Sequence, residues 1–258
     1  MDPYRWSWDA DALVVIPGMA AAYAIALTRF PAPRWRIVCF AFGCVLMLAV
    51  QITPLDTLAL HYLLVMHLLQ NVTLAEWGPL LVVLGLTPQM AREVERIPGV
   101  RTLTHPLVAL PLWLGAYYLW HVPYFYDAAL RHQWTILHLE HATYFLAGCL
   151  LWWPVVHGRR SYGEKSVYVF AAFVLGSPLG LLLALLPNPI YDFYEHVPRL
   201  WGLSPLTDQQ IAGVTMASEQ AIVLFGALAF CLLRFLDEQS SADTYRAPTV
   251  RRGSPRSP

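Results

Sequence analysis

The sequence predicts an all-α membrane protein: a bundle of about seven transmembrane helices, with the N-terminus outside the cytoplasm and the C-terminus inside. The first observation is composition, since 57% of the 258 residues are hydrophobic and only 13% are charged. A soluble domain carries about 25% charged residues. The other two observations are the long hydrophobic runs and the uneven distribution of basic residues between them. The formal net charge of +0 argues against a general nucleic-acid-binding surface.

Each hydrophobic run is long enough to cross a bilayer, which takes about 20 mainly apolar residues. The first run resembles a signal peptide, but arginines follow it and acidic residues precede it, so we expect a retained helix. We expect residues 1–236 to form the transmembrane domain and the Ser-, Pro- and Arg-rich residues 237–258 to form a disordered cytoplasmic tail. The runs lie at approximately 11–28, 37–53, 60–86, 105–121, 135–156, 166–187 and 211–236.

Basic residues alternate between rich and poor connections along the chain. The second-to-third connection has none, and the fourth-to-fifth and sixth-to-seventh connections have only Arg131 and Arg199. The intervening connections and the tail each hold at least three. Cytoplasmic loops carry an excess of Lys and Arg, so the alternation predicts the orientation. The abundance of Arg and Ala, with one lysine, is typical of a high-GC bacterium, and we expect a bacterial plasma membrane.

Seven of the nine histidines fall on the predicted outer side. His67 and Asn71 are four residues apart, and His138 and His141 are three apart, so each pair shares one helix face. His121 ends the fourth run on the same side. Ionisable groups within a membrane are costly and usually face a bundle interior, a partner or a cavity. The spacing therefore predicts that these side chains meet inside the bundle.

A polar stripe descends the last predicted helix from its outer end. Asp208, Thr215 and Glu219 are separated by seven and four residues, so they lie on one face, with Met216 nearby. Asp208 is also suited to cap the start of this helix.

Glu76 lies deeper in the membrane, in the third run and close to Gly78 and Pro79. Proline removes a backbone hydrogen bond, so we expect a kink here. Mid-membrane carboxyl groups such as Glu76 and Glu219 are rare, and they serve either a function or an interhelical hydrogen bond.

The outer histidines, with Asp208 and Glu219, have the chemistry of a metal site. Imidazole is a common ligand for copper and zinc, and a carboxylate often orients a ligating histidine. Each histidine alone also fits a hydrogen-bonded structural residue, and His132 and His196 fit ordinary loop positions. The predicted metal-ligand candidates are His67, His121, His138 and His141.

Four motifs, in order along the chain, resemble the CtaG-type family of cytochrome c oxidase assembly factors, which is linked to caa-type oxidases. They cover roughly residues 58–236. The motifs are His67–Asn71 followed by Pro79–Gly85; Trp120–Pro123 followed by Tyr126–Leu130; His138–His141 with Phe145 and Trp152–Pro154; and Asp208–Gly213 at the start of the last helix.

The resemblance implies seven helices and a non-enzymatic role in maturing the copper-containing oxidase, by delivering copper to its catalytic subunit. The implied cargo is a transient copper ion, with Met216 as a soft ligand, and the implied partners are an oxidase subunit and a periplasmic copper donor. The family pattern on the third helix is commonly His-x-x-x-His, whereas here Asn71, a poor copper ligand, takes the second position. The expected surrounding polar residues are Asn71, Glu76, Asp127, Glu140, Asp208, Thr215 and Glu219.

Three other functions remain open. A metal-free scaffold for the oxidase fits the asparagine at position 71. A proton-coupled carrier would use Glu76, Asp208 and Glu219 as relay groups, although no internal repeat is visible. A membrane cytochrome would bind haem non-covalently through paired histidines, since the sequence has no Cys-x-x-Cys-His motif. A soluble enzyme is disfavoured, because no nucleotide-binding or nucleophile–base motif is present.

Overall fold

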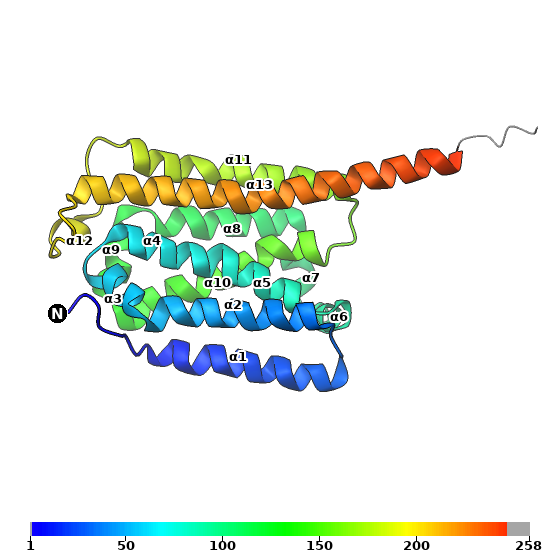
Figure 1. The fold of residues 1–258 in the computed structure, drawn as a ribbon, viewed down its shortest axis with the longest axis horizontal. Coiled ribbons are helices and arrows are strands. Elements are labelled where there is room, and N and C mark those ends of the chain that lie inside the picture. The colour runs from blue at the N-terminus through cyan, green and yellow to red at the C-terminus, as the bar shows by residue number, and fades with distance from the viewer. Residues whose placement is uncertain (1, 247–258) are drawn as a thin grey trace, which may run out of the picture.

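The computed structural model describes residues 2–246, and this part of the chain forms a bundle of long helices with no strand (Figure 1). Every predicted hydrophobic run is mainly helical, which confirms the helical-bundle fold. The helices that correspond to the runs are α1 (Ala10–Arg29), α2 (Arg34–Ile52), α4–η1–α5 (Leu64–Val72, Thr73–Trp77 and Gly78–Gly85), α8 (Pro106–Trp120), η2–α10 (Gln133–Leu137 and His138–Val156), α11 (Tyr162–Leu185) and α13 (Pro205–Arg246).

Short helices fill the connections at the two ends of the bundle. At the end where the N-terminus lies are α3 (Pro54–His61), α9 (Pro123–Arg131) and α12 (Asp192–Glu195) (Figure 1). We call this the N-terminal end; the sequence predicts that it faces outward. At the opposite end are α6 (Pro88–Val94) and α7 (Val100–Leu103). We call it the basic end, because arginine-rich connections such as residues 92–101 lie there.

Five helices in the described part of the chain are long and apolar enough to cross a membrane. They are α1, α2, the combined segment α4–η1–α5, α11 and α13, and α8 is a shorter apolar helix of 15 residues. These helices support a membrane protein. The count of seven spans and their orientation stay predictions from the sequence.

Two predicted boundaries differ from the structure. The third run does not form one helix from residue 60, because Tyr62 and Leu63 leave helical geometry between α3 and α4. The last helix extends beyond the predicted range 211–236 at both ends, so residues 237–246 are helical. The rest of the predicted tail, residues 247–258, lies outside the described residues.

The start of α4 is capped by a side chain from a distant part of the sequence. Its own N-cap residue, Leu63, makes no side-chain cap hydrogen bond. Instead, the carboxylate of Asp208 in α13 accepts hydrogen bonds from the backbone N–H groups of Leu64 (2.8 Å) and Val65 (3.0 Å). Asp208 is fully buried. The helix start needs such a partner because the first N–H groups of a helix have no intrahelical acceptor and water is absent from a membrane interior.

The predicted kink beside Pro79 takes the form of a π-helical turn, η1. Proline lacks an N–H group, so the backbone in the preceding turn needs other donors and more room. The indole Nε1 of Trp152 in α10 donates to the carbonyl of Glu76 (3.0 Å). Gly148 of α10 packs directly over the carbonyl of Ala75, where a Cβ atom would come within 2.1 Å of the oxygen.

We expect Gly148→Ala to destabilise the protein by about 1–3 kcal/mol, the usual cost of overpacking a core. The added Cβ has no free space, because it meets backbone rather than a flexible side chain. Gly115→Ala in α8 is the matched control, since nothing lies within 4 Å of the position that its methyl group would take. Denaturant titration of the detergent-solubilised protein measures both, and equal stability of the two variants would contradict the close packing of α10 on η1.

We expect Asp208→Ala to destabilise the protein by at least about 2 kcal/mol, because two buried N–H groups lose their acceptor and each costs about 1–3 kcal/mol unpaired. Asp208→Asn keeps one acceptor oxygen, so its loss should be about half as large. The same denaturant titration compares them. An alanine variant as stable as the original protein would show that α4 does not depend on this cap.

Candidate functional site

His67 is the centre of a buried polar cluster at the N-terminal end of the bundle. It lies in α4 with no exposed surface. Its Nδ1 atom is 3.0 Å from the hydroxyl of Tyr126 in α9 and 3.1 Å from that of Tyr194 in α12. Its Nε2 atom is buried and makes no hydrogen bond to a described residue. Three segments distant in sequence therefore hold one imidazole and leave one of its nitrogens free.

The hydrogen bonds of Tyr194 and Tyr126 relate to different tautomers of this ring. The Tyr194 hydroxyl donates its hydrogen to the carbonyl of Ala59 (2.6 Å). It can then bond to His67 only as an acceptor, which requires the proton on Nδ1. In that tautomer Nε2 of His67 carries the lone pair, which is the form that binds a metal. In the other tautomer the Tyr126 hydroxyl donates to Nδ1, and Nε2 carries the proton.

His121 shows the same arrangement at the end of α8. Its Nδ1 donates to the carbonyl of Tyr117 (2.7 Å) and lies 3.3 Å from the hydroxyl of Tyr144. Because a carbonyl only accepts, Nδ1 carries the proton and the lone pair of the neutral ring is on Nε2. That Nε2 is also buried without a partner among the described residues. The rings of His67 and His121 lie close to Tyr126, with centroids 5.1 and 6.0 Å from its ring centroid.

His141 of α10 is the third histidine of the cluster. It is 7% exposed, and neither of its ring nitrogens has a hydrogen-bond partner among the described residues. Electrostatic interactions connect His67 with both His141 and His121, so the three rings are neighbours. We call His67, His121 and His141 the histidine cluster. Together they present four buried nitrogens without partners in the described part of the chain, although buried polar atoms in proteins are nearly always paired.

Asn71 and Glu140 form a hydrogen bond beside this cluster. Asn71 Nδ2 donates to Glu140 Oε1 over 2.9 Å, joining α4 to α10. Both side chains are buried, and Asn71 Oδ1 and Glu140 Oε2 have no partner among the described residues. Asparagine at position 71 therefore serves as a donor to a buried carboxyl group, in the place where the resemblance led us to expect a second histidine.

His138 is a neighbour of His141 on α10 but differs from the histidine cluster in having carboxylate partners in the N-terminal segment. Its two ring nitrogens are 3.4 Å from Asp9 and 2.8 Å from Asp11, and its side chain is 22% exposed. His138 and His141 do line a common cavity between α1, α2 and α10, of about 590 Å³. The structure thus gives His138 carboxylate partners of its own, while His141 has none among the described residues.

The predicted polar stripe of α13 serves separate contacts along the helix. Asp208 caps α4, and Glu219 accepts a hydrogen bond from Trp77 Nε1 (2.8 Å). Thr215 is half-buried between them. Met216 is 1% exposed and belongs to the hydrophobic core that also contains Tyr126. The thioether is therefore buried in the core that surrounds the histidine cluster.

A second polar cluster lies deeper in the bundle, between η1 and α13. Gln220 Nε2 donates to Glu76 Oε1 (3.0 Å) and to the hydroxyl of Tyr117 (2.8 Å). Adjacent residues of η1, Glu76 and Trp77, thus pair with adjacent residues of α13, Gln220 and Glu219. These interhelical hydrogen bonds are the structural alternative that the sequence left open for both carboxyl groups.

The other predicted residues lie outside these clusters. Asp127 in α9 accepts a hydrogen bond from the backbone N–H of Phe193 (3.2 Å), which ties α9 to α12. Burial raises the pKa of Asp127 above its usual range. His132 and His196 are exposed, as expected for loop positions.

The arrangement has the ligand types of a copper site without a closed geometry. Unpartnered imidazole nitrogens, and a thioether buried in the core that contains Tyr126, suit Cu(I). Among the described residues, however, no group of three or more His, Cys, Asp or Glu side chains is arranged to hold a metal ion. The copper and metal-binding prediction is therefore not confirmed. Such a set of donors can bind a soft ion only if side chains move to enclose it.

Sequence reasoning missed the tyrosines and amides that position the predicted residues. Tyr126 and Tyr194 fix the His67 ring, and Tyr117 fixes His121. Asp56 was also missed; it accepts a hydrogen bond from Gln70 (2.8 Å), and burial raises its pKa to about 6. Gln220 could have been predicted from the sequence, since it is an amide next to a mid-membrane glutamate. The tyrosines could not, because tyrosines near a membrane surface are too common to single out.

Comparison with known proteins places the chain in one family. The family model described as cytochrome c oxidase caa3 assembly factor matches residues 21–238. Uncharacterized proteins of Mycobacterium bovis and Mycobacterium tuberculosis are 24% identical to the chain over 239 residues, which covers 81% of this chain and 36% of each relative. One of Mycobacterium leprae is 23% identical with the same coverage.

The chain thus spans about a third of the length of these curated relatives. No solved structure matches it. The matched segment begins within α1 and ends within α13, so it includes both polar clusters. This protein belongs to the family of cytochrome c oxidase caa3 assembly factors.

Proposed function

We propose that this protein assists the insertion of copper into a caa3-type oxidase, and that it receives Cu(I) at the N-terminal end of the bundle. The observation that carries the proposal is the set of unpartnered nitrogens on the histidine cluster. Desolvating a polar atom without a hydrogen bond costs about 1–3 kcal/mol. A cluster that retains four such atoms fits a site whose partner is a ligand rather than protein.

The hydrogen bonds that orient the histidine rings support copper binding. The carbonyl of Tyr117 holds Nδ1 of His121, which leaves its Nε2 lone pair for a metal. The Nε2 lone pair of His67 is available in the tautomer in which Tyr194 accepts from Nδ1. Hydrogen bonds to the other ring nitrogen commonly orient metal-binding histidines. Met216 supplies a buried thioether in the same core. The absence of a preformed three-ligand group among the described residues fits weak, transient binding, which a protein that passes its ion onward requires.

The bundle location fits transfer within the membrane. The histidine cluster is buried, but His141 also lines the cavity between α1, α2 and α10. This cavity opens the cluster toward the side of the bundle, where a membrane-embedded oxidase subunit could approach. A periplasmic donor would reach the cluster from the predicted outer face. The site requires no reaction beyond exchange of ligands, in keeping with a non-enzymatic role.

A metal-free scaffold for an oxidase subunit is the second candidate function. The hydrogen bond between Asn71 and Glu140 favours it, because this pair joins two helices where a second histidine would add a ligand. In that case the polar clusters serve bundle stability and partner recognition.

We expect His67→Ala, His121→Ala and His141→Ala each to weaken Cu(I) binding by at least about tenfold, the lower bound for losing even an outer-shell partner of a metal. Copper affinity should also fall at low pH, because protonated imidazole does not bind metal. Competition with a chromophoric Cu(I) chelator measures the affinity of the purified protein, and metal analysis of the oxidase measures delivery in cells.

His132→Ala is the matched control, because this histidine is exposed near the same end of the bundle. Copper affinity unchanged in all three cluster variants would remove the proposed site. If the purified protein binds no Cu(I) but the cluster variants still lower oxidase assembly, the scaffold function replaces copper delivery.

A further inference from the structure

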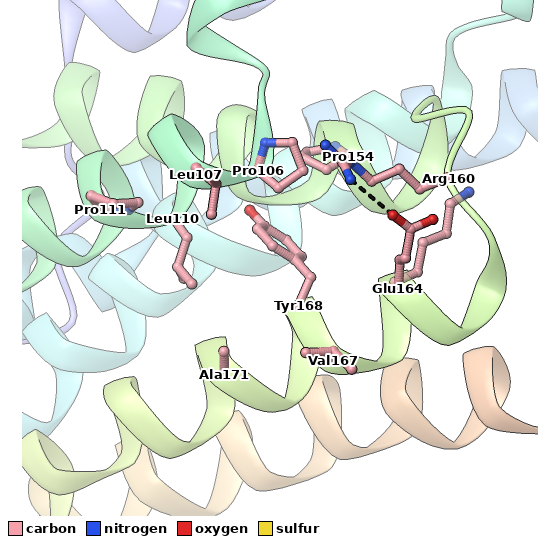
Figure 2. A pocket seen from close by; sticks show the side chains of 11 residues that line it. Pro106, Leu107, Leu110, Pro111, Pro154, Arg160, Glu164, Val167, Tyr168 and Ala171 are labelled. Atoms are coloured by element: carbon pink, nitrogen blue, oxygen red, sulfur yellow. Dashed lines mark hydrogen bonds and ion pairs between the residues drawn. The ribbon is translucent and has the colours of Figure 1, made fainter.

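A groove with apolar walls and a charged head lies at the basic end of the bundle, between α8 and α11. Its cavity has a volume of about 450 Å³. Figure 2 shows Leu107, Leu110 and Pro111 on α8 facing Val167 and Ala171 on α11, with Tyr168 at its base. Leu107 and Val167 are 80% and 70% exposed. In a membrane these walls contact acyl chains rather than water.

The charged end of the groove, its head, carries two cationic side chains and one anionic side chain that is already hydrogen-bonded within the protein. Arg160 and Lys165 line it together with Glu164. Both oxygens of Glu164 are engaged: Oε1 accepts from Arg160 (2.9 Å), and Oε2 accepts from the backbone N–H and hydroxyl of Ser161, each at 3.0 Å. Figure 2 shows the Arg160–Glu164 contact at one end of the apolar walls.

Lys165 has the weakest interactions with the protein of the three charged side chains that line the groove. It makes no salt bridge with a described residue, and its ammonium lies 5.2 Å from the centre of the Tyr162 ring. Arg160 also donates to Nε2 of His105, at the start of α8, over 3.0 Å. Arg160 and Lys165 outnumber Glu164, so the head of the groove has a net positive character. Lys165 interacts electrostatically with Glu238 of α13, outside the groove, and it can bind a further anion without losing a salt bridge.

We propose that this groove binds an anionic phospholipid, with the phosphate beside Arg160 and Lys165 and one acyl chain along Leu107, Leu110 and Val167. The ligand must be amphipathic, because the cations and the apolar walls belong to the same cavity. It must be anionic, because the one acidic side chain among the described residues that line the cavity is already paired within the protein. Basic pockets between membrane helices on the cytoplasmic side are suited to such headgroups.

The geometry of α8 explains why space for a lipid exists here. This helix has 15 residues, which at about 1.5 Å per residue spans less than the roughly 30 Å hydrocarbon core. It begins at Pro106, and Pro111 removes a further backbone N–H from its first half. The short helix leaves α11 uncovered next to the basic connection, and a lipid chain can fill the gap. This inference is independent of copper binding.

The test uses the full chain in nonionic detergent, because the surface of such a micelle carries no charge that would attract an anionic lipid. Phosphatidylglycerol is titrated as the probe, and phosphatidylcholine is the reference. Native mass spectrometry measures the bound lipid. Lys165 is the only lysine, so acetylation at this residue reports headgroup occupancy. We expect tighter binding of phosphatidylglycerol than of phosphatidylcholine, and protection of Lys165 by the anionic lipid alone.

We expect Arg160→Gln to weaken phosphatidylglycerol binding about fivefold, the effect of the roughly 1 kcal/mol that one basic residue contributes near an anionic headgroup. Arg159→Gln is the matched control, because this exposed arginine is adjacent in sequence but does not line the groove. Leu110→Trp should block the acyl chain and reduce lipid binding while Lys165 stays reactive. Equal losses for the Arg159 and Arg160 variants, equal affinity for both lipids, or undiminished binding to the tryptophan variant would overturn the proposal.

Discussion

The bundle depends on one constraint: inside a membrane, the polar groups of the protein must find partners within the protein itself. The capping of α4 by Asp208 shows how this constraint shapes the fold. The third predicted span is interrupted at Tyr62 and Leu63, which exposes the N–H groups of a new helix start, and a carboxylate from α13 accepts from two of them. The cap supplies acceptors that the break in the helix makes necessary. They fix α4 against α13, and this contact sets the position of His67.

The deeper cluster and the histidine cluster each meet this constraint only in part. Glu76, Glu219 and Gln220 share donors across η1 and α13. One oxygen of each of these three side chains has no partner among the described residues, and the histidine cluster likewise keeps unpartnered nitrogens. Asp208 accepts a hydrogen bond from a helix start that lies 144 residues away in the sequence. The fold can therefore bring a distant hydrogen-bond partner to a buried polar group such as an imidazole. The copper proposal rests on the type of atom left unpaired, because imidazole nitrogens bind copper readily.

The hydrophobic runs predicted the helices because a membrane span depends mainly on local composition, which a single sequence contains. The break before α4 was not predictable, because it relies on a partner in the last helix. Helix periodicity correctly placed His67, Asn71 and Glu219 inside the bundle. It could not predict that His138 has carboxylate partners and His141 has no hydrogen bond, since those carboxylates come from the N-terminal segment. Likewise, Asp208 suggested a cap for its own helix and instead caps another.

The most direct test of the central claim is X-ray absorption spectroscopy of the purified protein loaded with Cu(I). The claim is that unpartnered imidazoles, held by tyrosines and carbonyls, bind the ion at the N-terminal end of the bundle. The account predicts a spectrum dominated by imidazole nitrogen scattering, with at most one sulfur ligand from Met216. Coordination by sulfur alone, or the absence of bound copper after loading under reducing conditions, would contradict it.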